Sequence, residues 1–193
     1  YNNLGTLLFE LKNLDEAIDY YEKAINLNKD FVEALVNIGC AKRLLNKSNE
    51  AIEFFKKVIK LKPNHTEAYN FLGVAYYDIG KKEEALENLK KAIKIKPDYA
   101  EAYNHLGVVL RKLTRFDESL ASYNKSIKFN PYKKETYLNL GGLYTNLGKY
   151  NEATQAYKKA IEIKPDYALA HSNLLFNINC KQDFDPQEYL REA

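Results

Sequence analysis

Glycines recur along this chain at intervals of 34 residues, and isoleucines and prolines recur at the same interval. A fixed interval of this length indicates that one supersecondary unit is repeated, because a single globular core imposes no such spacing. An array of this kind has a long surface for binding and no obvious pocket for chemistry. The recurring residues are Gly5, Gly39, Gly73, Gly107 and Gly141; Ile25, Ile59, Ile93, Ile127 and Ile161; and Pro63, Pro97, Pro131 and Pro165.

The composition excludes several classes of protein. The chain has 193 residues, room for about five such repeats, and its 46% of hydrophobic residues argues against disorder. The net charge of +3, with acids interleaved among the lysines, argues against a nucleic-acid partner. No apolar run approaches the roughly 18 residues of a membrane span, so we expect no membrane insertion. Cys40 and Cys180 lack metal-ligand spacing and indicate free thiols in a reducing, cytoplasmic compartment.

Residues 134–167 show how one repeat is predicted to fold. Four residues at helical spacing form an apolar stripe, and Gly148 follows them with the freedom to end a helix in a left-handed conformation. Asn151 is predicted to cap a second helix, and Pro165 to end it. Each repeat therefore contributes two short antiparallel helices. The stripe consists of Tyr137, Leu140, Gly141 and Tyr144.

Small residues are predicted to let these helices approach one another closely. Gly141 is expected to face Ala153 of the same repeat, and Ala160 is expected to face the first helix of the next one. The predicted first helices are residues 32–45, 66–79, 100–113, 134–147 and 168–179. The predicted second helices are residues 15–28, 49–61, 83–95, 117–129 and 151–163.

The pattern Tyr-x-x-Leu-Gly-x-x-Tyr, then Ala-x-x-x-Tyr, then Pro resembles the tetratricopeptide repeat (TPR). Lys42 and Lys29 depart from it, replacing an aromatic residue and the proline. The resemblance implies an all-α fold, a right-handed superhelical solenoid of antiparallel helix pairs. It divides the chain into five 34-residue units over residues 1–167, the first of them truncated, and a degenerate sixth unit of capping or linker helices over residues 168–193. Because Tyr1 falls in mid-pattern, we expect the sequence to be a piece of a longer protein.

The sequence contains no motif for catalysis or cofactor binding. No Gly-rich phosphate loop, Cys-x-x-Cys pair or His-Glu-x-x-His helix is present. His65, His105 and His171 belong to three different repeats, so they are not expected to converge with a nucleophile and an acid. We therefore predict no catalytic residue, no cofactor and no metal site on this chain.

By resemblance to TPR arrays, the residue before each Leu-Gly pair points into a concave groove. Because an amide has both donors and an acceptor, a column of asparagines there can hold the backbone of an extended polypeptide, and we expect these amides to face solvent in the free protein. Arg43, Tyr77 and Arg111 are predicted to add side-chain preference in the same groove. The alternative, that these asparagines only cap or decorate helices, stays open. The predicted column is Asn3, Asn37, Phe71, His105, Asn139 and Asn173.

The asparagine column and the end of the chain resemble the TPR region of O-GlcNAc transferase-like (SPINDLY-like) glycosyltransferases. The resemblance continues through residues 168–193, where Asp185 and Pro186 make a predicted helix start, although Cys180 and Ala193 depart from that family. It implies that this chain recruits a polypeptide substrate for a UDP-sugar-dependent catalytic domain after residue 193. A general TPR assembly scaffold with no attached enzyme is the alternative, and a homodimer through an exposed end or the convex face is consistent with either.

A third hypothesis, a co-chaperone that holds a C-terminal carboxylate, conflicts with the sequence. That clamp requires a lysine followed four residues later by an asparagine on a first helix. None of the corresponding pairs matches this requirement. They are Asn2/Thr6, Val36/Cys40, Asn70/Val74, Asn104/Val108 and Leu138/Gly142.

Overall fold

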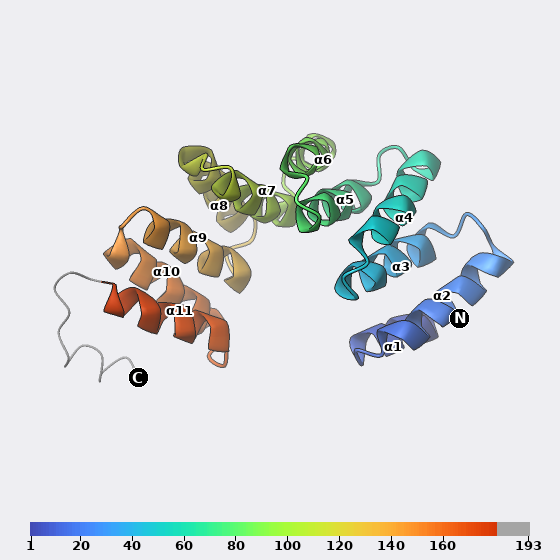
Figure 1. The fold of residues 1–193 in the computed structure, drawn as a ribbon, viewed down its shortest axis with the longest axis horizontal. Coiled ribbons are helices and arrows are strands. Elements are labelled where there is room, and N and C mark those ends of the chain that lie inside the picture. Colours follow the sequence, from blue (N-terminus) through green and yellow to red (C-terminus); the bar gives the residue numbers. More distant parts are fainter. Residues whose placement is uncertain (181–193) are drawn as a thin grey trace. The chain divides into compact units, whose positions relative to one another are not determined.

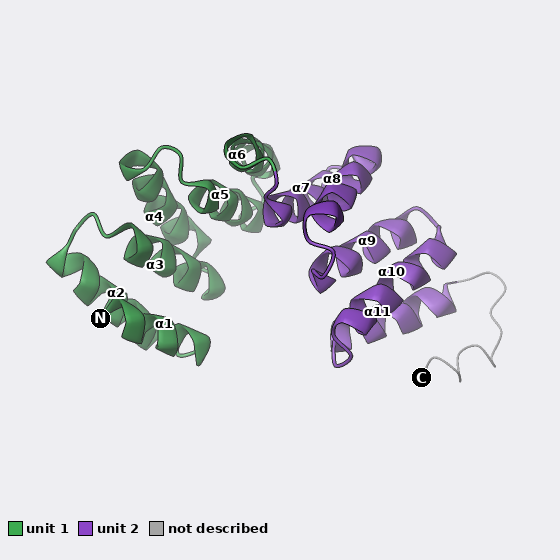
Figure 2. Cartoon of the chain, turned by 180° about the vertical axis from the view of Figure 1, so that it is seen from behind, with its two compact units in different colours: residues 1–97 green, residues 98–193 purple. Residues whose placement is uncertain are grey.

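The computed structural model describes residues 1–180, which form eleven α-helices and contain no strand (Figure 1). The predicted all-α class and the helix pairs are confirmed. The chain divides into two compact units, residues 1–97 and 98–193 (Figure 2). The predicted helix start at Asp185 and Pro186, and Ala193, lie outside the described residues.

Unit 1 consists of three helix pairs, each formed by a first helix and the antiparallel second helix that follows it (Figure 1). The turns within the pairs and the loops between them are short, so each pair packs on the next. The helices are α1 (Asn2–Glu10), α2 (Leu14–Leu27), α3 (Val32–Leu44), α4 (Ser48–Leu61), α5 (Thr66–Asp78) and α6 (Lys82–Ile95).

Unit 2 repeats this arrangement with two pairs and one further first helix. The helices are α7 (Ala100–Lys112), α8 (Phe116–Phe129), α9 (Lys134–Asn146), α10 (Tyr150–Ile163) and α11 (Ala168–Asn179). The predicted bounds of the paired helices agree with those of both units to within one residue.

A left-handed residue follows every first helix from α1 to α9 in the same register. Gly148 has φ 69°, as predicted, and the amide of the next residue, Lys149, donates to Tyr144 O over 2.9 Å. This bond satisfies a carbonyl in the last helical turn. Non-glycine residues adopt the same conformation at the equivalent position of other repeats. The position in the repeat, and not only the residue type, therefore determines the turn. The left-handed residues are Lys12, Asn46, Gly80, Thr114 and Gly148.

The recurring glycines allow a large side chain of the second helix to lie against the first helix. A Cβ built on Gly141 would be 2.4 Å from the ring of Tyr157, and one on Gly107 would be 2.5 Å from the ring of Tyr123. Our prediction that Gly141 faces Ala153 agrees with the equivalent pairs Gly5/Ala17 and Gly73/Ala85, where an added Cβ would be 3.2 and 3.1 Å from the alanine carbonyl oxygen. The nearest neighbour of Gly141, which the prediction did not name, is the ring of Tyr157 one helical turn further on. That ring needs the space that a missing side chain provides, and it is buried there.

The other two local predictions for this repeat had different outcomes. Ala160 is fully buried in a cluster with Ala170 and Leu174 of α11, as expected for a contact with the next first helix. Asn151 does not cap α10, because the helix begins one residue earlier and its N-cap position is Lys149, which makes no side-chain cap bond. Asn151 is exposed in the first turn instead.

Candidate functional site

The first helices lie side by side within each unit, and this arrangement creates two candidate binding faces (Figure 2). We call α1, α3 and α5 the first-helix face of unit 1, and α7, α9 and α11 the first-helix face of unit 2. Each face carries three of the six residues predicted for the column. Asn3 is exposed, and the other five are half-buried: Asn37, Phe71, His105, Asn139 and Asn173.

Two of the predicted asparagines already make hydrogen bonds with the preceding first helix. Asn37 donates its amide to Asn2 Oδ1 over 3.3 Å, and Asn139 donates to Asn104 Oδ1 over 3.0 Å. The expectation that these amides simply face solvent is therefore wrong. Each of the two side chains donates one N–H to the neighbouring asparagine, and this hydrogen bond fixes the orientation of the amide. Its carbonyl oxygen and second N–H remain as hydrogen-bonding groups.

The sequence contains a signal for these two asparagine–asparagine hydrogen bonds, and an alignment of the repeats does not reveal it. The partners are 35 residues apart (37 − 2 = 35 and 139 − 104 = 35), one more than the repeat. Comparison at 34 residues aligns equivalent positions, whereas a comparison at 35 finds residues that touch across adjacent first helices. Polar residues at both ends of that spacing predict the bond.

Arg43 on α3 has a carboxylate partner. Its Nη1 lies 3.2 Å from Asp78 Oδ2 at the end of α5, and Ser48 Oγ donates to the same oxygen over 3.4 Å. The charge of Arg43 is thus neutralised on the face of unit 1.

Arg111 occupies the equivalent position on α7, two repeats later, in a different environment. Within residues 1–180 it makes no ion pair. Its Nε is buried without a hydrogen-bond partner, as is that of Arg43. Its guanidinium crosses to α9, where a Cβ on Gly142 would be 2.6 Å from Nη1. Burial raises the pKa of the nearby Tyr157 phenol, while its hydrogen bond with Thr145 and the positive charge of Arg111 lower it.

The two remaining predicted residues have a partly structural role. Phe71 packs its ring on Phe55, with centroids 5.8 Å apart, and both belong to the core around α4 and α5. Tyr77 is half-buried near the end of α5. The Phe71 ring is therefore part of this core as well as of the first-helix face of unit 1.

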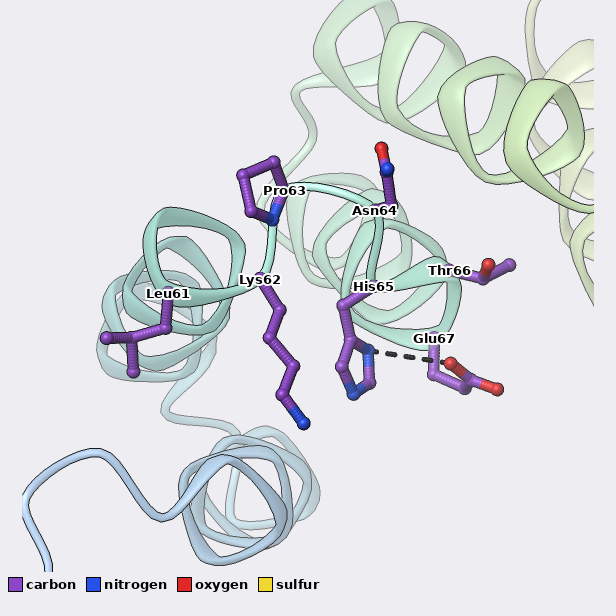
Figure 3. Close-up of a pocket in the computed structure, with 7 residues that line it drawn as sticks. All are labelled: Leu61, Lys62, Pro63, Asn64, His65, Thr66 and Glu67. Atoms are coloured by element: carbon purple, nitrogen blue, oxygen red, sulfur yellow. Dashed lines mark ion pairs between the residues drawn. The ribbon is translucent and has the colours of Figure 1, made fainter.

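A pocket outside these faces lies at the start of α5 and is lined by residues 61–67 (Figure 3). His65 Nδ1 accepts a hydrogen bond from the Ala68 amide over 3.2 Å and lies 3.5 Å from Glu67 Oε2. The bond to Ala68 makes His65 the N-cap of α5. The pocket lies on a loop and the start of a helix, and its lining contains no serine or cysteine.

Other reactive groups are few in the described part of the chain. Burial raises the pKa of the Cys40 thiol to about 11, which leaves it protonated and unreactive at neutral pH. Residues 1–180 contain no cluster of three or more His, Cys, Asp or Glu side chains suited to a metal ion. Among the same residues, every helix is too short or too polar to cross a membrane.

Family models for repeats of one type match most of this chain. A model described as tetratricopeptide repeat matches residues 1–31, 32–65 and 135–167, and a second with the same description matches residues 100–133. A model described as TPR repeat matches residues 75–114. A comparison with curated proteins gave no match.

Solved structures with similar folds include several TPR proteins. The crystal structure of MamA is 32% identical with a TM-score of 0.68, over 87% of this chain and 98% of that one. TTC0263, a thermophilic TPR protein of Thermus thermophilus, is 26% identical with a TM-score of 0.84, over 92% and 97%. YrrB, described as a TPR protein with an unusual peptide-binding site, is 25% identical with a TM-score of 0.62, over 88% of each chain.

Proposed function

The chain belongs to the tetratricopeptide repeat family, and we propose that it is a non-catalytic scaffold whose first-helix faces bind an extended polypeptide of a partner protein. One observation carries the proposal. In each unit, a half-buried asparagine of the middle first helix is hydrogen-bonded to an asparagine of the preceding first helix. Asn37 and Asn139 are each oriented by one hydrogen bond and keep an acceptor and a donor. An extended backbone offers the complementary groups at regular intervals. The peptide-binding site of YrrB, a protein of similar fold, supports the same use.

The test is a triple variant in which Asn37, Asn139 and Asn173 are changed to alanine. Each lost contact costs roughly 0.5–1.5 kcal/mol, so three together should weaken binding about tenfold or more. The measurement is a fluorescence titration of wild type and variant with one labelled unstructured protein, alongside thermal melts. A small loss of stability is expected as well, because Asn2 and Asn104 lose their donors.

A matched control removes three asparagines from second helices, where they are exposed: Asn49, Asn124 and Asn151. This control should bind the labelled protein as wild type does. Equal affinity of the first triple variant and wild type would refute the proposal. A collapsed melting transition in the first variant alone would instead show that its asparagines only hold the fold together.

A narrower proposal is that this chain is the substrate-recruiting arm of an O-GlcNAc transferase-like protein. The asparagines of the first-helix faces and the pattern of residues 168–180 favour it, since both resemble that family. A general assembly scaffold with no attached enzyme has at least equal support. The sequence encoded beyond residue 193 in the gene decides between them: a glycosyltransferase domain supports the narrower proposal, and any other continuation removes it.

The compartment and the oligomeric state are further parts of the proposal. Two free cysteines, Cys40 and Cys180, suit a reducing cytoplasm. Leu4 and Leu7 on α1 and Leu11 directly after it are exposed and give a homodimer a candidate surface. Light scattering of the purified chain should show a mass that rises with concentration, and a constant monomer mass would contradict the dimer.

A further inference from the structure

We propose that Arg111 is the receptor for an acidic side chain of the polypeptide bound on the first-helix face of unit 2, whereas Arg43 of unit 1 has no such role. The inference rests on the proposed function and adds the chemical class of the ligand. It follows from a comparison of two arginines that occupy the same position of the repeat, 68 residues apart (111 − 43 = 68).

The two arginines differ in what lies 35 residues further along the chain. For Arg43 that residue is Asp78, whose carboxylate is 3.2 Å away. For Arg111 it is Asn146, which has no charge. The described part of the chain gives Arg111 no other carboxylate, since Glu101 on the same helix is engaged by Lys133. Unit 1 therefore contains a neutralised arginine and unit 2 contains an available one.

The surroundings of Arg111 increase the benefit that a carboxylate would bring. Its guanidinium lies against the α9 backbone at Gly142, in space that any larger residue would fill. Its Nε is buried without a partner, as is that of Arg43, so the absence of a carboxylate is what distinguishes the two arginines. A guanidinium that is partly withdrawn from water has lost hydration, and a carboxylate restores both charge balance and hydrogen bonds. The fork of N–H groups matches a carboxylate with two parallel bonds.

The position of Arg111 fits a ligand held by the neighbouring asparagine. Gly142, against which the guanidinium lies, is three residues from Asn139, so both are on one side of α9. A polypeptide whose backbone bonds to Asn139 would therefore bring an adjacent side chain to Arg111. An aspartate or glutamate side chain suits an extended segment that continues past this point, and a terminal carboxylate is the other source of the same group.

The experiment is a selection from random linear peptides displayed with either a free or a blocked C-terminus. We expect wild type to enrich an acidic residue at one position in both libraries. Arg111→Gln should lose that preference, and so should Asn146→Asp, which gives Arg111 its own carboxylate as Asp78 does for Arg43. Conversely, Asp78→Asn releases Arg43 and should add a second acidic position. Lys112→Gln removes a charge from the exposed neighbour of Arg111 and should leave the preference unchanged.

A selected peptide then allows the effect to be measured. Changing its acidic residue to the amide should weaken binding to wild type about tenfold or more, as expected for a bond between charged groups. The same change should have little effect with Arg111→Gln, and thermal melts should show that each variant is folded.

Each other outcome has a distinct meaning. If wild type enriches no peptide at all, the proposed function fails, and this inference fails with it. If wild type enriches peptides without an acidic preference, or the preference survives in both Arg111→Gln and Asn146→Asp, only this inference is overturned. Enrichment solely in the library with free C-termini would overturn the side-chain assignment in favour of a terminal carboxylate.

Discussion

Units 1 and 2 share the same 34-residue repeat, but equivalent positions of the repeat carry different side chains. Val58 on α4 and Ala68 on α5 belong to one buried apolar cluster in unit 1. The equivalent residues of unit 2 are Ser126 and Thr136, whose buried hydroxyls are 3.0 Å apart. Backbone positions are thus shared between the units, while hydroxyls replace apolar groups. The repeat determines which positions of neighbouring helices meet. At each such contact between helices, the two side chains need only be compatible: both apolar, or both able to hydrogen-bond.

The glycines allow the largest test of this comparison. Gly107 of unit 2 faces the ring of the fully buried Tyr123, whereas Gly73 of unit 1 faces Leu89. Gly107→Ala should lower the free energy of unfolding by about 3 kcal/mol, the upper end of the usual range for overpacking. Gly73→Ala should lower it by less, because the added Cβ would have one atom of Leu89 within 3.0 Å, whereas at Gly107 it would have three atoms of the rigid Tyr123 ring within that distance. Denaturant unfolding measures both. Equal losses would show that the shared backbone, and not the differing side chain, sets the limit.

The buried hydroxyls provide a second, smaller test. Ser126 donates to Ala100 O over 2.8 Å, which leaves Thr136 to donate to Ser126. Ser126→Ala should cost about 1–2 kcal/mol, since the buried Thr136 hydroxyl loses its acceptor. Adding Thr136→Ala makes the junction apolar as in unit 1 and should recover most of that loss. The check is a double-mutant cycle by chemical denaturation. Additive losses would mean that the two hydroxyls are not a matched pair.

The smallest expected effect concerns the left-handed turns. Thr114 of unit 2 has φ 58°, a conformation that a β-branched residue adopts at a cost, and Gly80 holds the equivalent position of unit 1 with φ 80°. Thr114→Gly should raise stability by about 0.5 kcal/mol, because relief of strain outweighs the added freedom of the unfolded chain. A shift of the thermal midpoint measures this gain, with Gly80→Thr expected to reverse it. A loss on Thr114→Gly would show that the threonine fits its turn without strain.

The sequence predicted the helices well because the register repeats. The bounds of α2 to α11 were predicted to within a residue, since the glycine and proline positions mark the repeats, whereas no bounds were predicted for α1. Gly148 was correctly predicted to be left-handed, but Lys12 and Thr114 could not be, because their residue types disfavour that conformation. The start of α10 was misplaced because Asn151 looks like a cap in isolation, whereas the helix begins at Tyr150.

The candidate site was less predictable than the fold. The positions of Asn37 and Asn139 on first helices followed from the pattern, but their bonds to Asn2 and Asn104 did not. Those bonds depend on which helices touch, and a comparison of equivalent positions contains no such information. The difference between Arg43 and Arg111 was not predictable for the same reason. Both occupy the same position of the repeat, and they differ only in the residue that the neighbouring first helix places beside them.

The bond between Asn2 and Asn37 restricts how a gene for this chain can be rearranged. Deletion of one repeat, residues 37–70, would remove one helix pair and preserve the register of the helices that remain. It would also bring Phe71 to the position of Asn37 (71 − 34 = 37), so that Asn2 would face a phenyl ring. An amide without its partner in a half-buried contact is unfavourable. Repeats of equal length are therefore not interchangeable parts: each is matched to its neighbour, and recombination that ignores the order of repeats leaves mismatched junctions.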